Sequence, residues 1–283
     1  MSNEQHPDTP AAARLACFGS PAQLKAAAAQ LNVNSVRIDP GGATFPTIGA
    51  ALASITDNSR QKQYLVSVGP GTYNEQVVLK PYVYVQGAGQ DQTTVTQPPT
   101  PQGNIQNRGT VIASANSNIS DMTISCTGGS WGEWSTALLV PASGPFYADN
   151  VALVCDDEGD AGINMETVAV NWNTAGGGAS QLYLSYSTVT ARGQSHETTA
   201  VALTVGTQGA VEAIESKVVA QGAGQSFGVS TALYGTVTLD DCYIEGGSFA
   251  LYNSDGTGPI TANNCQIDGP VSGGVVVNNN DNS

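Results

Sequence analysis

The feature that most constrains the fold of this chain is a short strand pattern that recurs from residue 81 onward. Seven segments share the pattern, and they follow one another at offsets of 39, 29, 36, 29, 26 and 23 residues. Each segment has small or apolar residues at alternate positions, which is typical of a β-strand with one buried face. The segments are PYVYVQG (81–87), SDMTISC (120–126), DNVALVC (149–155), YSTVTAR (186–192), ESKVVAQ (215–221), DDCYIEG (240–246) and NNCQIDG (263–269).

The aligned segments form three columns of small or apolar residues. The columns are Val83, Met122, Val151, Ser187, Ser216, Cys242, Cys265; then Val85, Ile124, Leu153, Val189, Val218, Ile244, Ile267; and then Gly87, Cys126, Cys155, Ala191, Ala220, Gly246, Gly269. Columns that persist while the spacing varies indicate coils stacked about 4.8 Å apart, with extra residues leaving as loops.

A second strand in each coil is expected from further apolar runs, at 136–140, 200–205, 249–254 and 274–279. The repeat predicts a parallel β-helix of about seven to nine coils, because a sandwich or propeller does not maintain one ladder over this length. Leu153 and Ile244 are then expected to be fully buried.

Helical patterns precede the repeat. Residues 20–32 begin with a candidate N-cap serine followed by proline, and residues 45–55 have apolar residues at helical spacing. We expect both helices to cap a β-helix domain over 20–283, preceded by a polar segment over 1–19. The Asn/Asp-rich C-terminus lacks a comparable cap, so the strand edges of the last coil need another cover.

The charge balance excludes several classes of partner. With 9 Lys+Arg against 23 Asp+Glu, the net charge is −14, which argues against nucleic-acid binding and against an anionic membrane surface. The apolar runs are too short for a transmembrane helix. The N-terminus has neither the basic start nor the apolar core of a signal peptide. The polar, Lys-poor composition nevertheless suggests an extracellular or cell-surface protein.

The five cysteines are Cys17, Cys126, Cys155, Cys242 and Cys265, and none forms a C-x-x-C pair. Two pairs share a column of the repeat, namely Cys126 with Cys155 and Cys242 with Cys265. We therefore expect reduced thiols packed in the core, and no metal site.

Residues 36–97 resemble the opening of pectin methylesterases and their pectin-lyase-like relatives. The matching motifs are F-x-T-I-x-x-A-L at 45–52, a P-G-x-Y-x-E-x-V segment within 69–77, and G-x-G at 87–89. The stretch STALLVPASGPFYADNVALV (135–154) is similar to a later coil of the family. The resemblance implies an all-β fold, a single-stranded right-handed parallel β-helix with a short N-terminal helical cap. It also implies a polysaccharide ligand.

The family's catalytic positions are not reproduced. Its ester hydrolysis uses an Asp nucleophile, a second Asp as acid/base, an Arg and oxyanion-binding Gln side chains. Here Ser135 or Thr136 stands where the first Gln belongs, and Asp157 and Glu158 stand where Gln-Asp belongs. Gln194 or a neighbour takes the nucleophile's place, and Arg192 is the last arginine of the chain. Asp157 and Glu158 are the candidate catalytic carboxylates of a rearranged or incomplete set.

The candidate ligand-binding residues lie in expected turn insertions. Trp131 and Trp134 flank Glu133 in a Gly-rich loop, and Trp172 lies in another insertion. Indole rings offer apolar faces on which sugars stack, although the same rings could pack on the solenoid wall. His196 and Glu197 could form an acid/base couple, or His196 could be an ordinary surface residue.

The acidic run DDEGD (156–160) allows three interpretations, namely a solvated turn, a calcium site or an acid/base pair. Insertions at 128–136, 156–166, 171–178 and 192–199 are expected to line one side of the solenoid and to build a groove together.

The sequence therefore predicts a pectinesterase-like β-helix protein that binds or de-esterifies a polysaccharide, without a metal or cofactor. Methylated or neutral glycans are favoured, because the negative net charge repels polyanions. The alternative is a structural or adhesive β-helix surface protein with no ligand. The sequence leaves the oligomeric state open.

Overall fold

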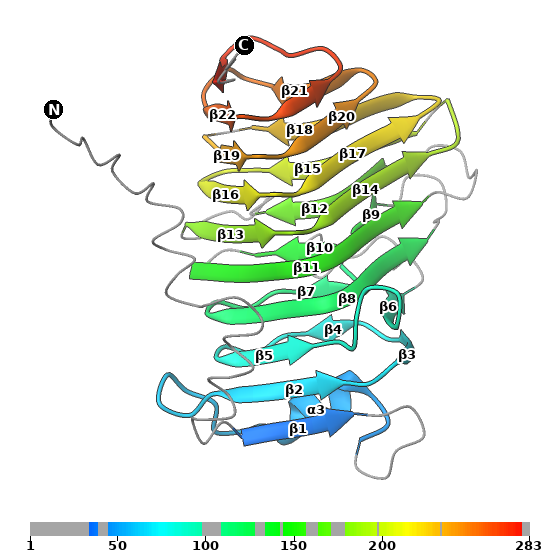
Figure 1. Ribbon diagram of the computed structural model, residues 1–283, viewed down its shortest axis with the longest axis vertical. Coiled ribbons are helices and arrows are strands. Elements are labelled where there is room, and N and C mark those ends of the chain that lie inside the picture. The colour runs from blue at the N-terminus through cyan, green and yellow to red at the C-terminus, as the bar shows by residue number, and fades with distance from the viewer. Residues whose placement is uncertain are drawn as a thin grey trace, which may run out of the picture.

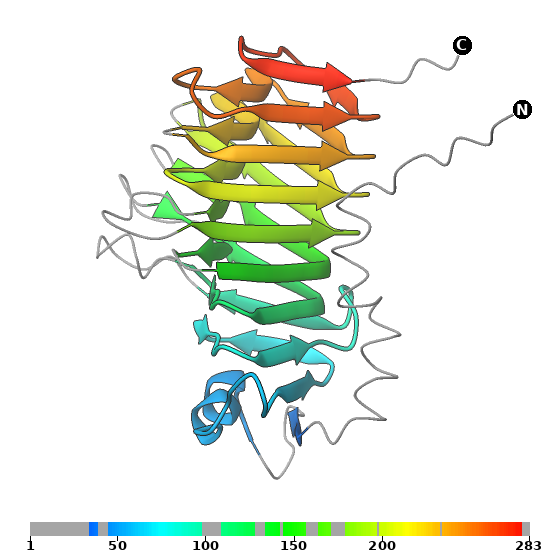
Figure 2. The ribbon, with the colours of Figure 1, turned by 90° about the vertical axis from the view of Figure 1, so that its left-hand side faces the viewer.

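The protein is a solenoid of stacked parallel strands (Figure 1). The computed structural model describes residues 34–38, 45–97, 109–127, 134–141, 144–156, 164–170, 179–196, 198–232 and 234–278. Figure 2 shows the coils stacked one above another, from the short helix α3 at one end to the last strands at the other.

Two hydrogen-bonded sheets form the three walls of the solenoid. The larger is continuous through β8 and β11, and its two walls are here called sheets 1 and 2, while the smaller is called sheet 3. Sheet 1 contains β1 (Asn34–Ile38), β2 (Tyr64–Val68), β5 (Val83–Gln86), the first halves of β8 (Ser117–Thr127) and β11 (Gly144–Asp156), β13 (Ser180–Ser185), β16 (Gly209–Ile214), β19 (Thr236–Asp240), β22 (Ile260–Asn263) and β24 (Val275–Asn278). Sheet 2 contains β3 (Gly71–Asn74), β6 (Thr93–Gln97), the second halves of β8 and β11, β14 (Thr188–Gly193), β17 (Lys217–Gly222), β20 (Tyr243–Gly246) and β23 (Gln266–Asp268). Sheet 3 contains β4 (Val77–Val78), β7 (Val111–Ile112), β9 (Trp134–Ser135), β10 (Leu138–Val140), β12 (Asn164–Val170), β15 (Thr199–Val205), β18 (Gln225–Thr231) and β21 (Phe249–Asn253).

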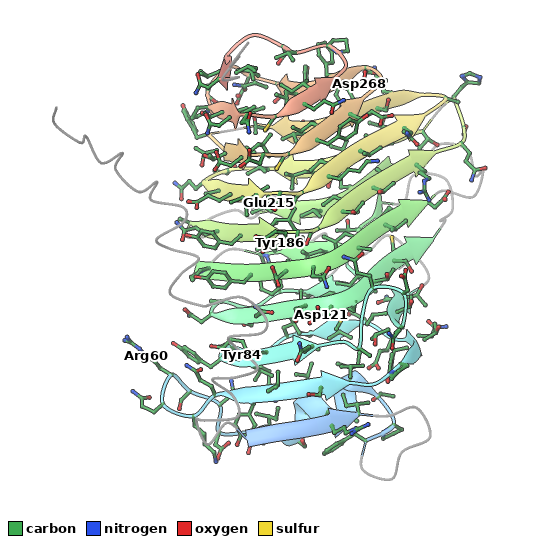
Figure 3. The ribbon with its side chains drawn as sticks, viewed as in Figure 1. Arg60, Tyr84, Asp121, Tyr186, Glu215 and Asp268 are labelled. Carbon is green, nitrogen blue, oxygen red and sulfur yellow. The ribbon has the colours of Figure 1, made fainter. Side chains whose placement is uncertain are left out.

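A single left-handed residue turns the chain from sheet 1 into sheet 2 in each of six coils. These residues are Asp121, Asn150, Tyr186, Glu215, Asp241 and Asn264, with φ between 46° and 56°. Four of the six are Asn or Asp, which tolerate this conformation better than other non-glycine residues. Figure 3 shows Asp121, Tyr186 and Glu215 in succession along this corner. An asparagine at this corner can also link neighbouring coils. The side-chain amide of Asn150 donates a hydrogen bond to Asp121 Oδ1 in the preceding coil, at 2.7 Å.

The predicted register is confirmed for six of the seven segments. In sheet 2, Ile124 pairs with Leu153, Leu153 with Val189 and Val189 with Val218, and the same column continues to Ile244 and Ile267.

The first segment was placed wrongly. Val85 pairs with Ile119 in sheet 1, whereas the sheet 2 partner of Ile124 is Val95. The reason is that Asp121 divides β8 into two halves with the same alternation, and segment 81–87 pairs with the first half.

The predicted helix at 45–55 is confirmed as α3 (Ile48–Ser54). Thr47 is its N-cap, and the Thr47 side chain accepts a hydrogen bond from the amide of Ala50 at 3.0 Å. Glu75 closes the same end, because its two carboxylate oxygens accept from the amides of Ile48 and Gly49, each at 2.8 Å. The motif glutamate of the sequence resemblance therefore ties the cap to the first coil. The predicted helix at 20–32 and the polar segment 1–19 lie outside the described residues.

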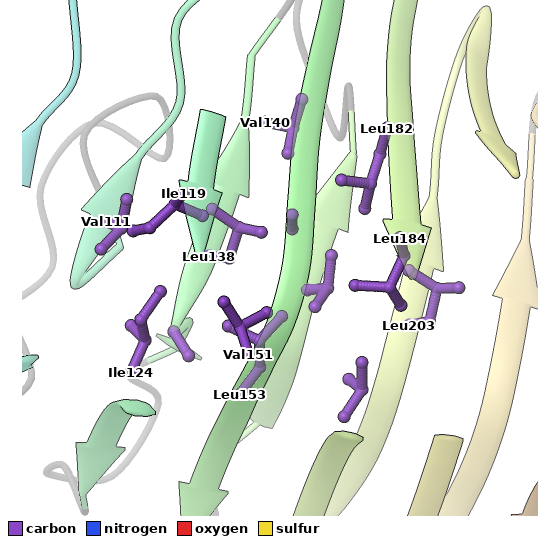
Figure 4. Packing of buried hydrophobic residues seen from close by; sticks show 14 of the residues in the cluster. Val111, Ile119, Ile124, Leu138, Val140, Val151, Leu153, Leu182, Leu184 and Leu203 are labelled. Atoms are coloured by element: carbon purple, nitrogen blue, oxygen red, sulfur yellow. The ribbon is translucent and has the colours of Figure 1, made fainter. Parts of the chain in front are cut away.

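The interior is a continuous set of aliphatic ladders. Figure 4 shows part of it, including Leu138 from sheet 3, Leu153 from sheet 2 and Leu182 from sheet 1. Leu153 and Ile244 are completely buried, as predicted. Large-to-small changes in such a tightly packed interior are costly.

The four cysteines within the described residues are free and buried. Cys126 and Cys155 pair in register, and their Sγ atoms lie 3.1 Å apart. Burial raises the pKa of the Cys155 thiol well above its usual value, so little of it ionises to the reactive thiolate near neutral pH. Cys17 lies outside the described residues.

Thiol titration of the unfolded, non-reduced chain is expected to find about five free groups, one for each cysteine in the sequence. The native chain should react slowly at the four buried positions, because the reagent needs an accessible thiolate. A count of one or three in the unfolded chain would reveal disulfides and contradict this assignment.

Candidate functional site

The outer surface of sheet 3 carries one row of residues in which each lies beside the next across neighbouring strands. Glu166 pairs with Val201, Val201 with Phe227, and Phe227 with Phe249. The pairing of Leu138 with Val168, continued by two residues, places Thr136 beside Glu166. The row faces outward, because Ala200, Ala202 and Leu203 of β15 supply the core while Val201 does not.

Glu166 is the only charged side chain that is buried among the described residues, with 5% of its surface exposed. A carboxylate is costly to remove from water, and a protein that retains one on a sheet surface often does so for binding or catalysis. Thr136, one of the two residues (with Ser135) that the sequence resemblance places at the first Gln position, is the neighbour of Glu166 in the preceding coil. Glu166 was missed in the sequence, where its only signal was a single charge inside the apolar strand NMETVAV (164–170).

The rest of the row has no second ionisable group. The two positions that follow Glu166 are occupied by Val201 and Phe227. Thr204, also on the outer side of β15, is buried, and its hydroxyl oxygen has no hydrogen-bond partner. An unpaired buried polar atom of this kind costs free energy, and the Thr204 oxygen is not accessible from outside.

An aromatic cluster ends the row. The rings of Phe227 and Phe249 are stacked with centroids 6.1 Å apart, and Tyr252 tilts against them at 5.1 Å and 4.9 Å respectively. All three rings are partly exposed. Because adjacent strands lie about 4.8 Å apart, Phe227 is about 10 Å from Glu166 along the solenoid axis. The cluster can offer a ligand an apolar surface close to the buried carboxylate.

A polar cluster lies at the ends of the sheet 2 strands. The side-chain amide of Gln194 donates to Asp156 Oδ1 at 3.0 Å, and Arg192 lies 3.9 Å from Asp156 Oδ2. The Arg192 side chain is about half exposed, so this ion pair contributes little to stability. His196 Nδ1 donates to the carbonyl oxygen of Ala223, 2.9 Å away in the next coil, which fixes the ring orientation. Asp156 directly precedes the predicted catalytic pair Asp157 and Glu158.

Three of the predicted insertions connect sheet 2 to sheet 3. The connections 128–133, 157–163 and 194–198 all run from a sheet 2 strand to a sheet 3 strand. Trp134 begins β9, and its backbone pairs with Asn164, two residues before Glu166. The Cα atoms of Trp134 and Glu166 are therefore separated by about 8 Å, from one strand spacing and two residue rises.

The predicted groove needs a correction. The connection 171–178 leaves the opposite end of β12, after Val170, and leads to sheet 1. It does not share the corner of the other three insertions, because a strand of seven residues separates the two ends of β12. Of the four predicted insertions, only the three that run from sheet 2 to sheet 3 share one corner.

Several predicted site residues lie outside the described residues, and their roles remain predictions. They are Trp131, Glu133, Asp157, Glu158, Trp172 and Glu197. Only the backbone of Trp134 is described. In the described ranges, no group of three or more His, Cys, Asp or Glu residues is placed to hold a metal ion, and no helix is long and apolar enough to cross a membrane.

No family model matches the sequence, and no curated protein matches it. Solved structures match in fold. A pectin methylesterase from Yersinia enterocolitica aligns with a TM-score of 0.55 and 15% identity, covering 83% of this chain and 81% of that chain. A pectin methylesterase from Aspergillus niger aligns with a TM-score of 0.54 and 18% identity, covering 86% of this chain and 80% of that chain. A pectin methylesterase in complex with a hexasaccharide aligns with a TM-score of 0.50 and 12% identity, covering 86% of this chain and 80% of that chain. At these identities the likeness shows the fold, so the chain is a right-handed parallel β-helix of the pectin methylesterase type.

Proposed function

We propose that the protein binds a neutral or methyl-esterified polysaccharide across the outer surface of sheet 3. The observation that carries the proposal is the buried carboxylate of Glu166 in a row that ends in partly exposed aromatic rings. Carbohydrate sites combine apolar platforms with a few polar groups that fix orientation. A glycan laid along the solenoid axis would contact Glu166 and the Phe227 cluster together.

The same geometry favours binding over efficient ester hydrolysis. Acid/base ester hydrolysis of the family type needs two carboxylates and a cation at the reacting centre. The described row offers one carboxylate and no cation, and Arg192 lies outside the row, 3.9 Å from Asp156. Asp157 and Glu158 are the candidates for any residual de-esterification.

The ligand class follows from charge and from the fold comparison. A net charge of −14 repels a densely anionic chain, so methylated or neutral glycans fit better. One solved structure of this fold is a complex with a hexasaccharide, which supports an oligosaccharide as the ligand. The polar composition supports a location outside the cell or at its surface.

The test is a glycan array read together with ester-hydrolysis assays on methylated and demethylated polygalacturonan. Retention of methylated or neutral glycans without methanol release supports a binding protein, and methanol release supports an active esterase. If no glycan is retained and no ester is hydrolysed, the proposal fails and a structural role takes its place.

The Trp131→Ala, Trp134→Ala double variant is expected to lose glycan retention while its melting temperature stays nearly unchanged. Both tryptophans belong to the connection that enters sheet 3 beside Glu166, and indole faces stack on sugars. Tyr234→Ala is the matched control, because it removes an exposed ring from a turn that does not join sheets 2 and 3. Retention that survives the double change would remove these two residues from the site.

A further inference from the structure

The outer surface of sheet 1 carries a row of large side chains, here called the tyrosine row. Each member is the neighbour of the next across adjacent strands. From β5 to β16 the members are Tyr84, Asn118, Tyr147, Tyr183 and Glu212. The rings of Tyr147 and Tyr183 are stacked, with centroids 4.9 Å apart and an interplanar angle of 12°. The row faces outward, because it alternates with core residues such as Phe146 and Leu182.

This surface is more buried than its described neighbours explain. Tyr183 is only 8% exposed. Two residues after Tyr147, Asp149 Oδ2 is shielded from solvent and has no hydrogen-bond partner. Tyr147 and Glu212 each make an interaction beyond the contacts given above. In the part of the chain that the structure describes, no helix or strand packs against the outer side of sheet 1. The low exposure therefore indicates a further cover over this surface.

The segment that precedes β1 has a charge that suits this surface. Residues 10–33 contain Arg14 and Lys25 and no Asp or Glu, in a protein whose net charge is −14. The outer side of sheet 1 carries Asp149 and Glu212. Opposite charges of this kind favour contact and fix its register.

The helix expected at 20–32 also has matching dimensions and a matching apolar face. Leu24, Ala28 and Leu31 recur at helical spacing, so they lie on one side of such a helix. A helix of this length extends over about 20 Å, and the tyrosine row from β5 to β16 spans about 19 Å, from the strand order and the strand spacing. Since α3 already closes the N-terminal end of the core, a second helix is not needed there.

We propose that residues 10–33 lie across the outer surface of sheet 1, with the helix at 20–32 along the tyrosine row. Because the chain enters sheet 1 at β1, the end of this helix lies nearest β5 and its start lies nearest β16. Leu24 and Leu31 then pack on the tyrosine rings, and Lys25 points toward Glu212. The segment ties five coils together, whereas each coil of a solenoid otherwise contacts only its neighbours.

The test uses one reporter cysteine in the 283-residue chain carrying Cys17→Ser. Asn118→Cys places the reporter in the tyrosine row, and Thr188→Cys places a matched reporter on the outer surface of sheet 2. The four native cysteines of the solenoid are buried, so a maleimide reports on the new thiol. Reversing the charges of the segment (Arg14→Glu, Lys25→Glu) should speed the labelling of Asn118→Cys by about ten-fold or more, because the reagent needs an accessible thiolate. The rate at Thr188→Cys should not change.

A charge swap separates a direct contact from a general loss of stability. Glu212→Lys, added to the charge-reversed segment, restores an opposite-charge pair, so the protection of Asn118→Cys should return. The proposal is overturned if charge reversal leaves the rate at Asn118→Cys unchanged, if it speeds Thr188→Cys equally, or if the swap restores no protection. Protection that grows with protein concentration would also overturn it, because the cover would then be a second copy of the chain.

Discussion

Replacing Glu166 with glutamine is expected to weaken glycan binding by about ten- to a hundred-fold, the equivalent of losing one charge-assisted hydrogen bond. Glutamine keeps the size and the polar atoms of the side chain and removes the charge. The variant should remain folded, because glutamine keeps the volume of the side chain and one carbonyl oxygen that can accept a hydrogen bond. Calorimetric titration with methylated oligogalacturonides measures the affinity, and thermal unfolding checks the fold.

Glu245→Gln is the matched control for this experiment. Glu245 lies on the outer surface of sheet 2, where it accepts hydrogen bonds from Gln221 and Tyr243, away from the row that contains Glu166. The affinity of the Glu245→Gln variant for glycan should equal that of the unchanged protein. If Glu166→Gln binds normally but melts at a clearly lower temperature, Glu166 has a structural role and the site is misplaced. If methanol release is present and only kcat falls, Glu166 acts in the reaction and not in binding.

Leu153→Ala should destabilise the protein by about 2–5 kcal/mol, the usual cost of a large-to-small change in a packed core. Leu153 is completely buried and stacks between Ile124 and Val189 of the adjacent coils. Each coil of a solenoid contacts only its neighbours. The damage should therefore be concentrated in β8, β11 and β14. Urea unfolding gives the free energy of unfolding, and hydrogen exchange locates the loss of protection.

Val154→Ala, one residue further along β11, is the control because this side chain faces outward and is only partly buried. Its cost should be below about 1 kcal/mol. Faster exchange spread evenly along the solenoid would mean that the coils unfold as one unit. A cost for Leu153→Ala no larger than that of the control would contradict the packing of this ladder.

The sequence by itself determined which residues face the core. The column from Ile124 to Ile267 could be predicted because the period of two belongs to each strand alone, and because stacked coils select small or aliphatic residues at the same position. The cap at α3 was also predictable, since helical spacing and the Thr47 N-cap are local signals. The fold class follows from these local regularities.

The tertiary structure alone decided which strands are neighbours. Asp121 adopts a left-handed conformation and divides β8 between two sheets, so Val85 and Val95, which have the same alternation, pair with different halves. Glu166 lies beside Thr136 because β12 pairs with β9 and β10, which come from an earlier part of the chain. The number of residues between two such strands is not constrained by the period of the strands themselves. Which outward residues meet across coils is therefore fixed by stacking, and no local pattern contains that information.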